Sequence, residues 1–112
     1  MADGDLLRGV LEPIVLDAVG RGATYGYDIA RAVFDRSQGK VVAQEGTLYP
    51  ALHRLERDGL LAASWGESPE GRKRKHYKLT ASGRKRLAAF REQWTDFSAT
   101  VSQLLGLAHA AG

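Results

Sequence analysis

The sequence predicts a mainly α-helical domain that contains one small β-hairpin and ends in a long helix. Apolar residues recur with the helical period in three segments before residue 58. The period then changes to two between residues 61 and 79, and an apolar heptad pattern follows to residue 105. With 112 residues, the chain fits one domain with one appended element.

Composition indicates an ordinary globular protein and excludes several kinds of site. Hydrophobic residues make up 44% and charged residues 26%, which is typical of neither a disordered tail nor a fibre. The absence of cysteine excludes a disulfide scaffold, a thiol nucleophile and a cysteine-based zinc site. No apolar run approaches the roughly 18 residues of a membrane span, and residues 1–5 are acidic where a signal peptide is basic. We therefore expect a cytoplasmic protein with no membrane contact.

The first two helices are expected over residues 6–20 and about residues 25–36. Pro13 interrupts the first pattern, so either the helix kinks there or a short turn precedes a helix that starts near Pro13. Thr24 is an expected N-cap of the second helix. The side chains of this helix that should face inward are Ile29, Ala30, Val33 and Phe34.

A third helix is expected over about residues 46–58, after a short stretch of strand character at residues 41–43. Pro50 fits only in its first turn, where no intrahelical donor is required. Gly59 would supply the left-handed residue that ends the helix. The buried ridge should consist of Leu48, Leu52 and Leu55.

Two alternating arms around a Pro/Gly loop at residues 67–71 predict a β-hairpin. The arms are residues 61–66 and 72–79, with Tyr77 and Leu79 as an inward pair.

Two further aromatic residues are expected to have structural roles. Trp65 lies on the same face of its arm as Leu61, which predicts a core position. Tyr27 is expected to pack against the hairpin, whereas for Tyr25 packing and a surface contact both remain open.

The last helix is expected over about residues 81–105, capped by Thr80. Its apolar residues are spaced 3, 4, 3, 4, 3, which is an a/d heptad seam, and they are Leu87, Phe90, Trp94, Phe97, Val101 and Leu104. At about 37 Å, the helix is longer than a compact domain of this size is wide. Its seam is therefore expected to pair with a second copy. Residues 108–112 are expected to form a frayed tail.

Positive charge is concentrated in one stretch. Between Glu70 and Glu92 there are nine bases and no acid, whereas the rest of the chain carries 7 bases and 13 acids. The formal net charge of +3 therefore divides into +9 and −6. This asymmetry indicates a surface for a polyanion, although a solvated basic face remains an alternative.

The order of elements, three helices followed by a hairpin with a basic tip and a seam helix, is that of a winged helix-turn-helix with a long C-terminal dimerisation helix. We expect residues 1–80 to form the DNA-binding domain, and residues 81–112 to form the dimerisation helix and tail. In this fold the N-terminal part of the third helix enters the major groove of double-stranded DNA. The residues within reach would be Thr47, Tyr49, His53 and Arg54. Wing residues suited to phosphate contacts are Arg72, Lys73, Arg74 and Lys75.

Other functional classes have little support. His53, His76 and His109 do not have metal-ligand spacing, and we expect neither a metal nor a cofactor. No phosphate-binding glycine loop or Gly-x-Ser-x-Gly motif occurs, so an enzyme is not indicated. A winged-helix protein-interaction module that does not bind DNA is the alternative. An RNA binder would need an exposed aromatic platform, which the sequence does not indicate.

Several segments resemble the PadR family of transcriptional regulators over about residues 6–105. They are Tyr25-Gly26-Tyr27-Asp28-Ile29, the run from Glu45-Gly46-Thr47-Leu48-Tyr49-Pro50 to Leu55-Glu56, Gly59-Leu60-Leu61, and the run from Gly71-Arg72 to Leu79-Thr80. The resemblance implies a homodimer, usually a repressor that binds a palindromic operator and releases it when a ligand binds. The single C-terminal helix is similar to that of the short subclass.

The resemblance also implies roles for individual residues. DNA contacts would come from Tyr25, Thr47, Tyr49 and the wing bases, while His76 stands where many members have Tyr. The dimer would form through the first and last helices, which adds Leu7 and Leu11 to the seam. Some members bind flat aromatic or cationic ligands between the two last helices, where Trp94 and Phe97 would stack on a planar aromatic effector. Packing of the dimer alone is the other role open to these two residues.

Overall fold

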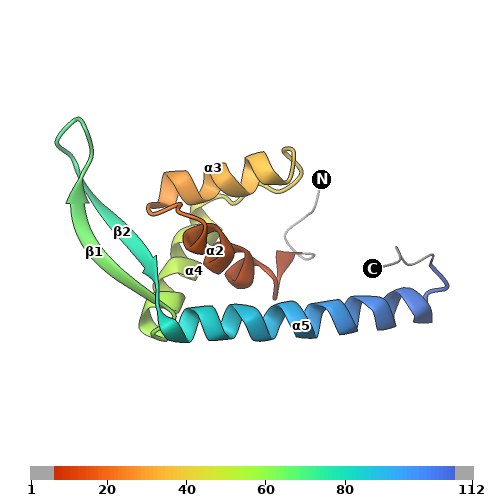
Figure 1. Ribbon diagram of the computed structural model, residues 1–112. Coiled ribbons are helices and arrows are strands. Elements are labelled where there is room, and N and C mark those ends of the chain that lie inside the picture. Colours follow the sequence, from red (N-terminus) through yellow and green to blue (C-terminus); the bar gives the residue numbers. More distant parts are fainter. Residues whose placement is uncertain (1–6, 108–112) are drawn as a thin grey trace.

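The computed structural model describes residues 7–107 and confirms the predicted fold class. Three helices form a bundle, a two-stranded antiparallel hairpin extends from one end of it, and a long helix runs beneath it (Figure 1). The elements are α2 (Leu11–Gly20), α3 (Gly26–Arg36), α4 (Glu45–Arg57), β1 (Leu61–Glu67), β2 (Lys73–Leu79) and α5 (Ala81–Leu104). No helix within the described range is long and apolar enough to cross a membrane.

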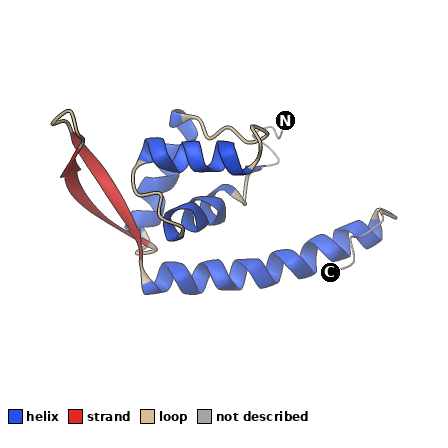
Figure 2. Ribbon diagram, turned by 45° about the horizontal axis from the view of Figure 1, so that its top comes forward, coloured by secondary structure: helices blue, strands red, loops and turns tan. Residues whose placement is uncertain are grey.

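The core lies between the three bundle helices and the base of the hairpin. Its most deeply buried large side chains are Leu16, Ile29, Leu48, Leu52, Leu55 and Leu61. Tyr77 and Leu79 close the core from β2, as the alternation predicts. The hairpin therefore contributes to the core only near its base, while its tip stands clear of the helices (Figure 2).

The first helix is shorter than its apolar pattern. It begins at Leu11, after a turn in which Gly9 has φ +87°, and Pro13 lies in its first turn. Of the two alternatives for Pro13, the structure shows the second, in which a short turn precedes a helix that starts near Pro13. Residue 6, where the pattern starts, lies outside the described residues.

Other local predictions need correction. Thr24 is not the N-cap of α3; Tyr25 holds that position without a side-chain cap bond. Residues 41–43 form no strand. Phe34 was expected to face inward but is 45% exposed, because the apolar side of α3 continues past the elements that cover it. Pro50 lies in the second turn of α4 because the helix already begins at Glu45.

The helix ends on either side of the hairpin follow the predicted chemistry. Gly59 has φ +76° and, with Leu60, returns two backbone N–H groups to the last turn of α4. The Thr80 hydroxyl accepts a hydrogen bond from the Gly83 N–H at 2.9 Å and donates to the Gly59 carbonyl at 2.7 Å. A Cβ on Gly83 would overlap the Leu60 carbonyl oxygen, so α5 starts directly against this turn.

The C-terminal half of α5 projects beyond the bundle. Its buried residues are Gly83 and Leu87, both in the first two turns. Arg91 still contacts α2, and beyond it the helix continues away from the other helices; the molecule measures 54 × 29 × 22 Å (Figure 1). Residues 108–112, the expected tail, lie outside the described residues.

Asp17 joins α5 to the bundle. Its carboxylate accepts hydrogen bonds from Arg21 and Arg36, each at 2.8 Å, and from Arg91 of α5. Partial burial by itself raises the pKa of Asp17, but the bonds from Arg21 and Arg36 outweigh it and hold the pKa below 3.8. One side chain of α2 therefore contacts arginines on α3 and α5.

The lowered pKa predicts loss of stability in acid. A carboxylate with a depressed folded-state pKa contributes stability above its unfolded pKa, and this contribution is lost as the pH falls through the folded value. Asp17→Asn should lower the free energy of unfolding at pH 7 by about 1 kcal/mol, because the arginine side chains are more than half exposed and screened. The difference from the unchanged protein should shrink below pH 3.8.

Urea unfolding at pH 7 and pH 3, at one protein concentration, measures this effect. Asp35→Asn is the matched control because, among residues 7–107, Asp35 forms an ion pair with Arg31 alone, on the exposed side of α3. Equal stability of the Asp17 and Asp35 variants at pH 7 would show that Asp17 does not stabilise the arrangement of the helices.

Candidate nucleic-acid interface

The predicted recognition helix, α4, has one buried and one exposed side. The buried side consists of Leu48, Ala51, Leu52 and Leu55. The residues predicted to reach DNA are all exposed, and they are Thr47, Tyr49, His53 and Arg54. The apolar ridge therefore fixes which side of α4 meets solvent.

These four residues do not form one cluster. Tyr49 faces α3 and the hairpin, whereas the Arg54 Nε donates to the Glu12 carboxylate of α2 at 2.8 Å. Thr47 and Arg54 line a separate groove of about 1120 Å³ between α2, α4 and α5. His53 lines neither this groove nor the one between the hairpin and the N-terminal ends of α3 and α4.

Close packing on a glycine positions Tyr49. A Cβ on Gly26, the first residue of α3, would lie 2.6 Å from the Tyr49 hydroxyl oxygen. Only a hydrogen at this position lets the phenol ring lie against the start of α3. Tyr49 remains 48% exposed there, with its ring at the surface.

Tyr25 is held against the edge of β2. The Tyr77 N–H donates to the Thr24 carbonyl at 2.6 Å, and the Thr24 hydroxyl lies 3.2 Å from Nδ1 of His76. The Tyr25 ring meets the His76 ring edge-on, with centroids 5.6 Å apart. Tyr25 is half-buried and packs against the hairpin, which is one of the two roles left open for it; the surface contact stays a prediction.

The four wing bases have different surroundings. The Lys75 Nζ donates to the Glu56 carboxylate of α4 at 2.6 Å, and this bond raises the pKa of Lys75. The Arg74 guanidinium lies 3.6 Å from the centre of the Tyr25 ring, a cation–π contact. Arg72 and Lys73 are exposed and form no ion pair with any residue in the described range. These two bases are therefore the ones available to phosphates.

A groove of about 880 Å³ separates the hairpin from the N-terminal ends of α3 and α4. All four tyrosines of the chain line this tyrosine groove, and they are Tyr25, Tyr27, Tyr49 and Tyr77. The four wing bases and Trp65 also line it, together with Gly26, Ser68 and Glu70. An elongated anion with apolar parts matches this lining.

The core prediction for Trp65 is wrong. Trp65 is 69% exposed because β1 extends beyond the helices, so the face that is buried at Leu61 is open to solvent at Trp65. Tyr27, which was expected to pack against the hairpin, is 66% exposed near the start of α3. Alternation predicts the face of a strand but does not reveal where the helices beneath it end.

Sequence reasoning also missed two supporting residues. Gly26 contributes no side chain, and Glu56 reads as an ordinary helix-end charge. Their contacts with Tyr49 and Lys75 join segments that are distant in the sequence, and no periodic pattern signals such pairs. Within residues 7–107, no group of three potential metal ligands occurs.

Comparisons with known proteins agree with this geometry. The profile of the transcriptional regulator PadR-like family matches residues 15–89. The transcriptional regulator Rv3488 of Mycobacterium tuberculosis is 43% identical over 67 residues, which is 60% of each chain.

Solved structures are similar over nearly the whole chain. A transcriptional regulator from Clostridium thermocellum has a TM-score of 0.82 and 29% identity, covering 89% of this chain and 97% of its own. A PadR-like transcriptional regulator from Bacillus cereus has a TM-score of 0.75 and 32% identity, covering 91% and 97%. The profile match over more than half of its length shows that this chain belongs to the PadR-like family of transcriptional regulators.

Proposed function

We propose that the chain regulates transcription by binding double-stranded DNA through α4 and the hairpin. The observation that carries this proposal is the exposed side of α4 next to the tyrosine groove, where Arg72 and Lys73 have no ion-pair partner among residues 7–107. Tyr49 and His53 would reach base edges, and the free wing bases would bind phosphates. Residues 1–80 would form this DNA-binding domain. Arg54, paired with Glu12, is a weaker candidate.

We further propose that two copies bind a palindromic operator through a dimer made by α5. Trp94, Phe97 and Leu104 are 47%, 61% and 79% exposed, and they follow one another along the projecting part of the helix. The rings of Phe90 and Trp94 stack with centroids 6.0 Å apart. A continuous apolar stripe of this kind favours burial against another chain.

Two residues predicted for the interface belong mainly to the core of the single chain. Leu11 and Leu87 are each 6% exposed and have little surface left for a partner. The dimer interface therefore rests on Leu7, which is half-buried, and on the rest of the seam. That remainder consists of Phe90, Trp94, Phe97, Val101 and Leu104.

Repression and release by a ligand are the regulatory mode we propose. Trp94 and Phe97 present exposed rings on the seam, and a planar aromatic effector would stack between the copies there. Such a ligand would change the relative position of the two α5 helices and so the spacing of the two recognition helices.

Neutralising a free wing base should lower the salt dependence of DNA binding. Lys73→Ala abolishes about one phosphate interaction per protomer, so the slope of log affinity against log salt should become shallower by about 0.9 for each phosphate that is no longer neutralised. The measurement is fluorescence anisotropy with a labelled duplex between 50 and 200 mM salt, a range of about fourfold that resolves such a slope.

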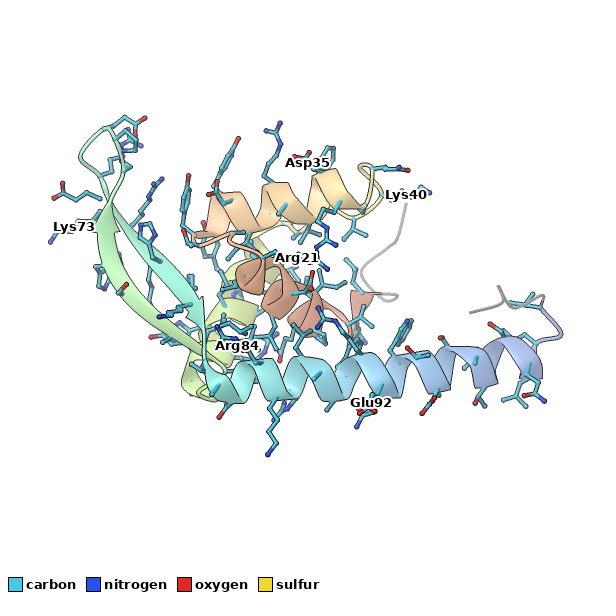
Figure 3. The ribbon with its side chains drawn as sticks, in the orientation of Figure 1. Arg21, Asp35, Lys40, Lys73, Arg84 and Glu92 are labelled. Carbon is cyan, nitrogen blue, oxygen red and sulfur yellow. The ribbon has the colours of Figure 1, made fainter. Side chains whose placement is uncertain are left out.

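Lys40→Ala is the matched control for this prediction. It removes the same charge from the opposite end of α3, far from the hairpin (Figure 3). If the slopes of log affinity against log salt were equal for the two variants, Lys73 would not contact a phosphate. Absence of duplex binding by the unchanged protein at low salt would instead favour a protein-interaction module.

A double-mutant cycle tests the placement of Tyr49. Gly26→Ala should weaken DNA binding by displacing the Tyr49 ring, while circular dichroism shows an unchanged fold. In a Tyr49→Ala background the Gly26 substitution should have almost no further effect, because the group it displaces is gone. Fully additive effects on affinity would show that Gly26 acts by another route.

A charge on the seam should separate the copies. Phe97→Asp places a carboxylate in the proposed apolar interface, and sedimentation at micromolar concentration should change from twice the 12.2 kDa chain mass to that of one chain. Glu92→Lys should leave the dimer intact, because Glu92 is not part of the heptad seam and points away from the bundle (Figure 3). A single-chain mass for the unchanged protein would contradict the dimer.

A further inference from the structure

We propose that Trp65 forms the outer wall of the tyrosine groove and packs against the deoxyribose of one DNA strand, whose phosphates lie on Arg72 and Lys73. This inference rests on the proposed DNA binding and adds to it a residue that the alternation pattern alone places in the core. It commits to the sugar–phosphate backbone of duplex DNA as the occupant of the groove.

The Trp65 ring is mostly exposed and has no aromatic or cation–π contact with another residue among residues 7–107. Trp65 lies opposite Lys75 in the strand register and on the same face as Ala63 and Leu61. Leu61 is buried and Ala63 is half-buried, but Trp65 is 69% exposed. The sheet face therefore changes from core to solvent along β1, and the largest side chain in the hairpin lies on the solvent side of that change.

The charges around Trp65 favour the sugar–phosphate backbone of DNA over an apolar partner as the occupant of the groove. The groove is lined by four bases, and Glu70 is the one acid among its described lining residues. Lys75 pairs with Glu56 and lies opposite Trp65 in the strand register, so its aliphatic stem and the indole add apolar surface on the same face of the hairpin. Lys73 lies two residues from Lys75 and on the same face of β2. Apolar surface next to a cation matches the alternation of sugar and phosphate.

The tyrosines on the helix side of the groove suit the same ligand. Tyr27 and Tyr49 expose ring surface and a hydroxyl each, at 66% and 48% exposure. Phenol groups pack against sugars and donate hydrogen bonds to phosphate oxygens. All four tyrosines and one of the two tryptophans of the chain thus line one groove.

The proposed dimer does not cover Trp65. The hairpin and the projecting end of α5 lie at opposite ends of the molecule in both views (Figures 1 and 2). A second copy seated on Trp94 and Phe97 would leave the tyrosine groove open.

Tryptophan fluorescence tests the interaction directly. Trp94→Phe leaves Trp65 as the one tryptophan of the chain. Adding a short duplex of arbitrary sequence at low salt should quench or shift the Trp65 emission, because binding to the backbone requires no particular sequence. An unchanged emission at saturating duplex, with binding verified by anisotropy of the labelled DNA, would overturn the proposal.

Affinity and its salt dependence give an independent measurement. Trp65→Ala should weaken duplex binding about tenfold, a typical effect of removing one aromatic side chain from such a site, while the salt slope stays unchanged because no charge is removed. Trp65→Phe should restore part of the affinity. Because position 65 is exposed, both variants should fold normally, and circular dichroism checks this.

The outcomes separate this inference from the proposed function. If Lys73→Ala weakens binding and Trp65→Ala stays within twofold of the unchanged protein, the DNA-binding function stands and the role of Trp65 is overturned. If the unchanged protein does not bind duplex DNA, both are overturned. If Trp65→Ala changes the sedimentation coefficient and leaves DNA affinity intact, Trp65 belongs to a protein interface and the proposal is wrong.

Discussion

The turn between α4 and β1 is the constraint on which the rest of the structure depends. The Leu60 carbonyl lies so close to Gly83 that α5 has one way to leave the hairpin, and the Thr80 hydroxyl bridges the two segments. This junction sets the direction of β1 and β2 on one side and of α5 on the other. The two exposed surfaces of the chain, one basic and one apolar, therefore start from a single packed point.

Charge in the hairpin is divided more finely than the sequence indicates. The four consecutive bases at residues 72–75 each count as one positive charge in the sequence, but packing places them in three different environments. Lys75 is bonded to Glu56, Arg74 covers Tyr25, and Arg72 and Lys73 are left to solvent. The polyanion surface is consequently smaller than the basic run, and its aromatic content is larger than the sequence pattern suggests.

Periodic patterns predicted the elements and most of the core. The leucine ridge of α4, the Gly59 helix end, the Thr80 cap and the inward pair on β2 all followed from local chemistry. The two wrong core positions share one physical cause. Periodicity identifies a face, but it carries no information on whether another element covers that face, so it places Trp65 and Phe34 in an interior that ends before it reaches them. Pairs such as Lys75 with Glu56 depend on tertiary distance and have no local signature.

Gly26 shows how a residue can matter for a surface to which it contributes no side chain. Its missing Cβ provides the space in which the Tyr49 ring lies. If the proposed DNA contact of Tyr49 holds, an alanine scan that scores loss of binding would mark position 26 together with the contact residues, although the substitution there adds atoms and removes none. At that position the residues sensitive to mutation and the residues in contact with the ligand would differ.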